Sequence, residues 1–432
     1  MELGGGGAAH LVSNSSAPPA RRLKVLRFLV VVAAVAAAVS SQLLPPSVVI
    51  VPSSWPFTSA PDFKKQQPLA PPECVVFNFG DSNSDTGNLV AGAGFRLHRP
   101  VGRRFFGKPS GRFSDGRLYI DFICERLGLD HLSPYMESSG VNFRHGANFA
   151  VAGAMVAGAA GTFELATQVR QFRHFKARTE DLRPRGLGSG ITSQEFQNAV
   201  YTFDIGQNDL QAAFSAGLSY ERVLERIPAI VARIKNAVTM LHEAGGRKFV
   251  LYNTGPVGCL PSMLARRRGG GELDRAGCLV DHNGVAGAFN AQLGRLCGEL
   301  RAELANSTVV CVDMHAIKYG LVANHTAHGE KATALSDQAR PVQAKDSSVC
   351  FSSGFSEPLM TCCGSGGPPY NYRPGKACGS PKVKACADGD HRISWDGLHY
   401  TEAANRVVAD EVLSAEYSDP PLRLQTLCTS PS

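Results

Sequence analysis

The chain has 432 residues, of which 44% are hydrophobic and 19% charged, so a large core can form and a wholly disordered chain is excluded. Its formal net charge of +7 is concentrated at the start, where residues 1–70 hold six basic and two acidic side chains. The remaining 38 basic and 35 acidic groups are too balanced to predict nucleic-acid binding.

A basic segment, residues 1–27, is followed by an apolar run, residues 28–44, and a proline-rich linker, residues 45–73. A charged segment before a short apolar run is typical of secretory targeting. The linker separates the run from the globular part, which argues against a buried helix. A cleaved signal peptide remains open, but the long basic leader favours an uncleaved type II anchor. We expect a secretory-pathway protein, and a Golgi membrane protein with a luminal domain is favoured over a secreted, apoplastic one.

Short apolar runs alternate with longer amphipathic ones across residues 74–420, which we interpret as one domain followed by a tail, residues 421–432. Continuous β-branched and aromatic runs suit parallel strands that are covered on both faces. The pattern predicts a doubly wound, flavodoxin-like α/β fold with a parallel sheet of about five strands flanked by helices. The clearest strands are predicted at 75–79, 199–203, 248–252 and 309–313.

Helices are predicted at 220–243, 283–304 and 401–415, where apolar residues recur at helical spacing. Active sites of such sheets form at the carboxyl ends of the strands. The irregular stretch 318–390 is expected to be a surface insertion held by disulfides.

Twelve cysteines fit an oxidising compartment, where disulfides persist. A zinc cluster is the competing interpretation of the crowded cysteines at 350, 362, 363, 378 and 386, but no Cys-x-x-Cys pair accompanied by histidines supports it. Asn306 and Asn324 begin Asn-x-Ser/Thr acceptor sequences for glycosylation of a luminal domain.

The sequence Gly80-Asp81-Ser82 ends the first predicted strand, where a tight turn exposes a hydroxyl. Alone it is most simply a turn. Near the other end of the chain, Asp396 precedes His399 by three residues. Within one loop, an Asp at this spacing can hold the imidazole Nδ1 and leave Nε2 free as a general base. We therefore predict Ser82, His399 and Asp396 as a catalytic triad.

Two middle segments complete the predicted site as an oxyanion hole. Residues 205–209 follow the second strand, and Asn208 there offers a side-chain amide donor. Residues 142–154 are rich in small side chains, which lets the Gly153 N–H approach a substrate oxygen. The Ser82 N–H is the third expected donor.

With these blocks in place, the chain resembles the plant GDSL esterase/lipases of the SGNH hydrolase superfamily across residues 74–415. Asn83 departs from the family pattern, because it stands where the motif's name has Leu. Further stretches at 111–117 and 362–372 resemble the early-nodulin/acetylesterase branch. The resemblance implies an SGNH hydrolase fold and assigns the four name-giving positions to Ser82, Gly153, Asn208 and His399, with Asp396 completing the triad.

The leading hypothesis is a serine ester hydrolase that removes acetyl groups from a cell-wall polysaccharide such as xylan or arabinoxylan. The alternatives are an acyltransferase with the same site, a lipase or esterase acting on other acyl esters, and a carbohydrate-binding protein with an idle site. No metal or organic cofactor is expected, the membrane is contacted only through the N-terminal segment, and a monomer is predicted.

Several other residues are expected to be structural. Arg112 and Asp115 are predicted to pair and order a loop. Tyr370 and Tyr372 either stack on sugar rings or pack their own loop. The scattered histidines are interpreted as surface or packing groups: His98, His131, His145 and His174.

Overall fold

The structure, a computed structural model, describes residues 74–158, 163–267, 270–327, 354–387 and 391–428. The predicted leader, apolar run and linker lie outside these residues, as does Cys350. Within the described part, no helix is both long and apolar enough to cross a membrane.

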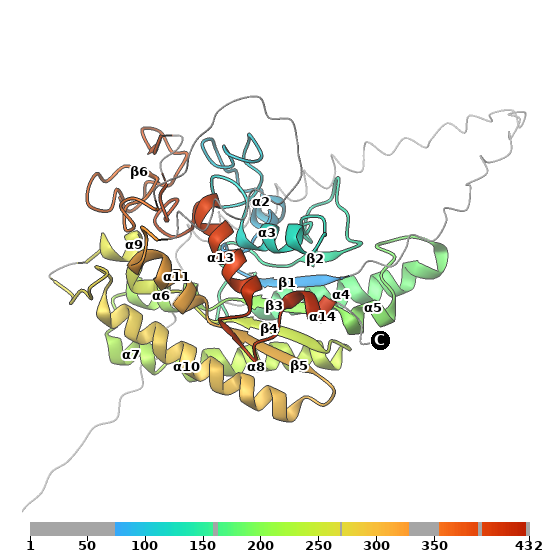
Figure 1. Cartoon of the computed structure of the whole chain (residues 1–432). Coiled ribbons are helices and arrows are strands. Elements are labelled where there is room, and N and C mark those ends of the chain that lie inside the picture. Colours follow the sequence, from blue (N-terminus) through green and yellow to red (C-terminus); the bar gives the residue numbers. More distant parts are fainter. Residues whose placement is uncertain (1–73, 159–162, 268–269, 328–353, 388–390, 429–432) are drawn as a thin grey trace, which may run out of the picture. The chain divides into compact units, whose positions relative to one another are not determined.

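A six-stranded, mostly parallel sheet with helices on both faces forms the centre of the fold (Figure 1). Its strand order is β2-β1-β3-β4-β5-β8, in which β8 alone pairs antiparallel. The order of the five parallel strands confirms the predicted doubly wound, flavodoxin-like arrangement. The strands are β1 (Val76–Gly80), β2 (Gly146–Asn148), β3 (Val200–Asp204), β4 (Lys248–Tyr252), β5 (Thr308–Val312) and β8 (Ser418–Asp419).

The four strands predicted from apolar runs are confirmed within one or two residues. The two shorter strands have no such signal. β2 has the sequence Gly-Ala-Asn, which carries no β-branched or aromatic residue, and the two-residue β8 is too short for any periodicity. Both lie at the sheet edges, where pairing with a neighbour, rather than propensity, makes them extended.

Alternate side chains of β1 face two separate cores. Phe77 and Phe79 contact one cluster and Val76 the other. The first cluster is covered by α4 (Leu165–Leu182), α5 (Ser193–Asn198), α6 (Gln207–Ser215), α7 (Tyr220–Leu224), α8 (Ile227–Glu243) and α10 (Val280–Glu303). The second is covered by α3 (Tyr119–Arg126), α11 (Met314–Ala323), α13 (Glu402–Ser414) and α14 (Leu424–Cys428). Figure 1 shows α8 and α10 on one side of the sheet, with α3 and α13 on the other.

The helix predicted at 220–243 is two helices, α7 and α8. The break falls just before Pro228, because proline has no N–H to bond to the Leu224 carbonyl, yet it suits the first turn of a new helix. The other two predicted helices are α10 and α13. The latter begins where the Thr401 side chain accepts a hydrogen bond from the Ala404 N–H. Short helical segments complete the fold: α2 (Asn88–Ala93), η1 (Arg183–Arg185), η2 (Val257–Cys259) and α9 (Pro261–Leu264).

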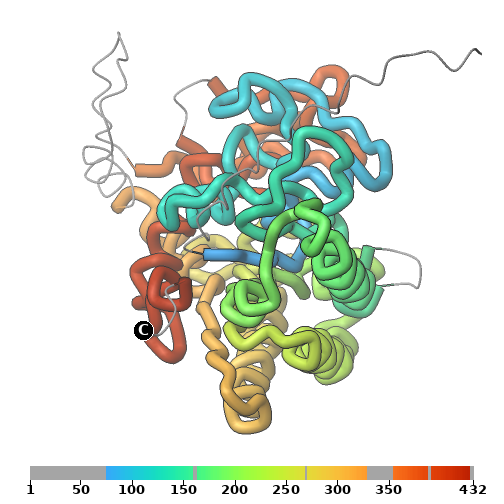
Figure 2. Tube along the Cα trace, turned by 90° about the vertical axis from the view of Figure 1, so that its right-hand side faces the viewer, coloured from blue at the N-terminus to red at the C-terminus, as the bar shows by residue number. Residues whose placement is uncertain are grey.

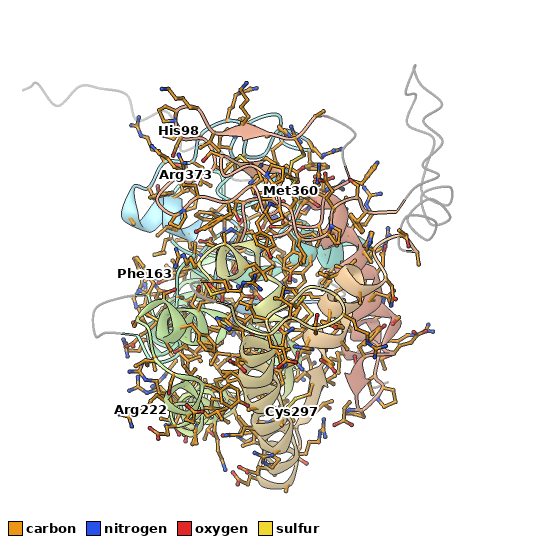
Figure 3. The ribbon with its side chains drawn as sticks, turned by 90° about the vertical axis from the view of Figure 1, so that its left-hand side faces the viewer. His98, Phe163, Arg222, Cys297, Met360 and Arg373 are labelled. Carbon is orange, nitrogen blue, oxygen red and sulfur yellow. A yellow bond between two sulfur atoms is a disulfide. The ribbon has the colours of Figure 1, made fainter. Side chains whose placement is uncertain are left out.

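The predicted insertion begins later than residue 318, because α11 extends to Ala323. Its described part, 354–387, holds only the two-residue strands β6 (Cys363–Gly364) and β7 (Lys384–Ala385), and is crossed by the disulfides Cys362–Cys386 and Cys363–Cys378. It lies beside segment 95–116, as Figure 2 shows, and the Arg103 guanidinium donates to the Cys386 carbonyl at 2.8 Å. In Figure 3, His98 from that segment and Met360 and Arg373 from the insertion lie at the end opposite Cys297.

The segment predicted as a tail contains α14, whose Leu424 and Leu427 are buried. A disulfide joins Cys428 at the end of α14 to Cys74 just before β1. These residues therefore pack against the sheet rather than trailing away from it. The remaining disulfides are Cys259–Cys278 and Cys297–Cys311, so disulfide bonding, as predicted, accounts for ten of the eleven described cysteines.

Candidate active site

The turn after β1 carries Ser82 at the carboxyl edge of the sheet. Gly80 ends the strand, and a Cβ there would come within 2.5 Å of the Asp204 carbonyl oxygen, so only glycine fits beside β3. The Asp81 N–H then donates to that same carbonyl at 3.2 Å, and the Ser84 N–H donates to the Asp81 carbonyl at 3.2 Å. These bonds hold Ser82 in a turn, where its side chain points away from the strand.

Ser82 and His399, 317 positions apart, meet at the centre of the site. His399 Nε2 lies 2.7 Å from Ser82 Oγ, and His399 Nδ1 lies 2.7 Å from Asp396 Oδ2. The other oxygen of Asp396 accepts the N–H groups of Leu398 and His399 at 3.0 and 2.9 Å. The loop before α13 therefore fixes the carboxylate, and the carboxylate fixes the imidazole. The structure brings the three predicted triad residues together.

Burial and charge have opposite effects on the pKa values of His399 and Asp396. Burial alone would lower the pKa of His399, but the Asp396 charge and hydrogen bond, helped by Asp81, raise it above the usual histidine value. Burial alone would raise the pKa of Asp396, but the facing His399 and two backbone N–H groups lower it. The arrangement favours an ionised carboxylate beside an imidazole that readily accepts a proton.

Asn208 lies in the first turn of α6, directly after β3. Its Nδ2 donates to the Ala154 carbonyl at 2.9 Å and, more weakly, to Asp81 Oδ2 at 3.3 Å. Gly153, the residue before Ala154, has a φ of +81° and open space where a Cβ would stand. Both segments that were predicted to form the oxyanion hole therefore reach the turn that carries Ser82.

Three buried polar side chains that the sequence reasoning did not single out hold these loops. Asp85 accepts the Ala152 N–H at 2.8 Å, and Asp209 accepts the Val156 N–H at 2.8 Å. Gln168 of α4 bonds both the N–H and the carbonyl of Gly80, at 2.9 and 2.8 Å. The only sequence signal for the two aspartates is that each lies shortly after a strand on a predicted site segment, and nothing local identifies Gln168.

The predicted pairing of Arg112 with Asp115 is wrong. Arg112 binds Asp121 through two nitrogens, at 2.6 and 2.7 Å, because α3 places that carboxylate directly opposite the guanidinium. Asp115 instead pairs with Arg104 and accepts the Glu402 N–H at 2.7 Å. Asp115 thus holds the first turn of α13, next to the loop that carries His399.

The tyrosine loop packs on itself. Thr361 bonds the carbonyls of Tyr370 and Asn371, and a Cβ on Gly397 would lie 2.5 Å from the Tyr372 ring. Tyr372 therefore covers the loop between Asp396 and His399, which favours the packing interpretation over sugar stacking. The described residues contain no cluster of three or more His, Cys, Asp or Glu side chains arranged to hold a metal ion.

A serine hydroxyl, an imidazole and a carboxylate in one chain of hydrogen bonds, on a doubly wound α/β sheet, define a serine hydrolase. The family model of the GDSL-like lipase/acylhydrolases matches residues 76–412. The chain belongs to this family, and it is a serine carboxylic ester hydrolase.

Plant relatives are similar to the chain over most of its length. The chain is 44% identical to the GDSL esterase/lipase LIP-4 of Arabidopsis thaliana over 358 residues, which cover 82% of this chain and 89% of the relative. It is 39% identical to an esterase of Hevea brasiliensis over 375 residues, 82% of this chain and 88% of that protein. It is also 38% identical to alpha-L-fucosidase 3 of Arabidopsis thaliana over 362 residues, 78% of this chain and 89% of the relative.

Proposed function

We propose that this esterase removes O-acetyl groups from a cell-wall polysaccharide such as xylan or arabinoxylan, through an acyl-enzyme on Ser82. His399 Nε2 takes the Ser82 proton as Oγ attacks the ester carbonyl carbon. The sugar hydroxyl leaves with that proton. Water, activated by the same imidazole, then attacks the acetyl group and releases acetate and free Ser82.

The negative oxygen of each tetrahedral intermediate needs preorganised donors. The N–H groups of Ser82 and Gly153 and the amide of Asn208 are the proposed ones. The bond to Ala154 holds one hydrogen of the Asn208 amide, and the second hydrogen, which makes only the longer bond to Asp81, is the one proposed to be shared with the substrate oxygen. The open space at Gly153 leaves room for that oxygen.

The observation that carries the proposed substrate is a short aromatic strip beside the triad. The Phe113 ring lies 5.2 Å from the His399 ring, and Phe95 stacks on Phe113 at 6.3 Å. Phe95 is 47% exposed, so two neighbouring aromatic rings lead from the imidazole to solvent. A strip of two rings suits the faces of sugar rings. The relative named as a fucosidase also favours a carbohydrate substrate.

A long-chain lipase needs a broader apolar surface. In the described part of the chain, the large apolar side chains that are exposed come from separate segments: Phe95, Phe105, Leu187, Leu273 and Val280. Of these, only Phe95 is joined to the triad through a ring contact. The surface therefore favours a short acyl group on a carbohydrate over a long acyl chain.

Phe95→Ala is expected to lower kcat/KM on acetylated xylan roughly tenfold, because the loss of one stacked ring removes about 1.4 kcal/mol of binding. Turnover of p-nitrophenyl acetate, which carries no sugar ring, should change little. The measurement is acetate release, with an added xylo-oligosaccharide acceptor to detect acyl transfer.

Phe105→Ala is the matched control, because that ring is 49% exposed and makes an edge-to-face contact with Phe106 rather than belonging to the strip. Equal loss on both substrates with Phe95→Ala would show that the strip does not recognise the polymer. Faster hydrolysis of long-chain esters than of acetylated xylan would overturn the proposed substrate, and acetyl groups on the acceptor would make the protein a transferase.

For the location, we propose a luminal Golgi enzyme anchored by its N-terminal segment. The disulfides already fit the secretory pathway, and Asn306 and Asn324 are both exposed. Expression in a secretory host should therefore add two glycans, seen as two mobility steps on endoglycosidase digestion. Asn306→Gln and Asn324→Gln should each remove one step, and an unshifted wild-type band would contradict luminal exposure.

A further inference from the structure

The nearly balanced charge of the globular part conceals an uneven distribution. Residues 95–117 hold seven basic side chains and one acidic one, and residues 354–387 of the insertion hold four and one. The rest of the described chain holds 23 basic and 27 acidic side chains. The surplus of positive charge therefore belongs to these two stretches, the basic segments.

Little of this positive charge is neutralised locally. The acidic side chain of the first basic segment, Asp115, already pairs with Arg104. That of the second, Glu357, pairs with Arg392. Seven basic side chains of the two segments are exposed and form no ion pair with any described residue: Arg96, Arg99, Lys108, Arg373, Lys376, Lys382 and Lys384. The basic segments are therefore complementary in charge to an anionic ligand.

The first basic segment borders the triad and contacts the second. Its Phe113 ring lies 5.2 Å from the His399 ring. Its His98 Cβ lies 3.0 Å from where a Cβ on Gly379 of the insertion would stand. Figure 3 shows His98 and Arg373, one from each segment, at the same end of the molecule. Charges from both segments can therefore act on one ligand beside the imidazole.

The second basic segment is hollowed next to the triad loop. A cavity of about 380 Å³ opens there, and its lining includes Lys382, Lys384 and Arg392 but no described acidic residue. Cys362 forms part of the same wall, and its N–H donates to the Ser394 carbonyl at 2.9 Å, in the loop that holds the triad carboxylate. The volume is at the low end of the range for small-molecule sites, which suits a single sugar unit.

We propose that the polysaccharide substrate is acidic, and that the basic segments bind carboxylate groups on sugar units close to the acetylated one. The inference rests on the proposed hydrolysis of a polysaccharide ester. A sugar that carries a carboxylate can use both a ring face and a charge, and Arg96 directly follows the exposed Phe95 of the aromatic strip. Anionic lipids are the competing ligand, but they are concentrated in the cytoplasmic leaflet, whereas the disulfides fit an oxidising compartment.

The test compares acetylated xylo-oligosaccharides with and without a glucuronic acid branch. The wild type is expected to show roughly tenfold higher kcat/KM on the branched substrate, the combined effect of two exposed charge pairs. Lys382→Gln/Lys384→Gln should lower that ratio to about two, and adding Arg96→Gln should bring it close to unity. Because salt screens exposed charges, about 1 M NaCl should also remove the preference of the wild type.

Arg183→Gln/Arg185→Gln is the matched control, because it removes two exposed charges at the same spacing. These arginines follow α4. Near its start, Gln168 bonds Gly80 at the carboxyl end of β1, and the 18 residues of α4 then carry the chain about 27 Å from its first turn. This control should keep the preference of the wild type for the branched substrate.

Binding is measured separately by calorimetry on Ser82→Ala protein. Equal affinity for branched and unbranched oligosaccharides would overturn the proposal, as would an equal loss of preference in the arginine control. Binding to phosphatidylserine vesicles that is lost in Lys382→Gln/Lys384→Gln, without any preference for the branched sugar, would assign the basic segments to a membrane surface instead. Failure of the proposed function is distinguishable, because the wild type would then release acetate from neither substrate, while calorimetry still reports whether the branch is bound.

Discussion

Ser82→Ala is expected to lower kcat on p-nitrophenyl acetate about 10⁴- to 10⁶-fold, because the acyl-enzyme cannot form without the hydroxyl. What remains is catalysis by the oxyanion donors and by binding alone. His399 and Asp396 stay in place in this variant, yet they have no nucleophile to activate. The measurements are steady-state turnover and stoichiometric labelling by an organophosphonate, which should mark a peptide containing Ser82 in the wild type and nothing in the variant.

Ser84→Ala serves as the control for this experiment. Ser84 belongs to the same turn and is equally buried, but its hydroxyl accepts from Asn78 at 3.0 Å rather than facing His399. It should keep turnover within severalfold of wild type and should still be labelled. If Ser82→Ala hydrolysed esters at a comparable rate, or if the label were found on another residue, the nucleophile would have to be reassigned.

The parts of the fold that were predictable are those in which one strand or helix buries many apolar side chains. The runs at β1, β3, β4 and β5 are apolar along their length because both of their faces are covered, so local pattern and tertiary role coincide. β2 is extended because it pairs with β1, and that pairing leaves no mark on its Gly-Ala-Asn sequence. The break between α7 and α8 was readable from Pro228, but helical spacing on both sides of it concealed the break.

The residues of the site also fall into two groups, those that a local motif predicts and those that only tertiary contacts bring together. Ser82, Asp396 and His399 lie in short motifs whose geometry is local, apart from the single long-range contact between hydroxyl and imidazole. Gln168 lies within an ordinary helical stretch, and its two bonds to Gly80 exist only once α4 packs against the sheet. The predicted partner of Arg112 was wrong for the same reason. Asp115 is nearer in sequence, but α3 brings Asp121 to the guanidinium. Contacts between elements decide these cases, and one sequence carries no direct record of them.

The double variant Cys74→Ala/Cys428→Ala is expected to lose about 6 kcal/mol of unfolding free energy, measured by guanidinium denaturation. This disulfide closes a loop of 354 positions and joins the residues just before β1 to the end of α14. In the chain-entropy account, opening a longer loop gives the unfolded state more conformational freedom. The buried Leu424 and Leu427 of α14 also lose the covalent link that holds them on the sheet.

The matched variant Cys363→Ala/Cys378→Ala opens a loop of only 15 positions, for which the same account gives about 3 kcal/mol. The denaturation midpoint should therefore fall further for the long loop than for the short one. Cys74 precedes the amino end of β1, whereas Ser82 follows its carboxyl end, so kcat/KM of the still-folded Cys74→Ala/Cys428→Ala protein at room temperature should stay at the wild-type value. Equal midpoint shifts for the two variants would mean that loop length does not govern the stabilisation, and a fall in kcat/KM would mean that the far end of the sheet controls the position of the nucleophile.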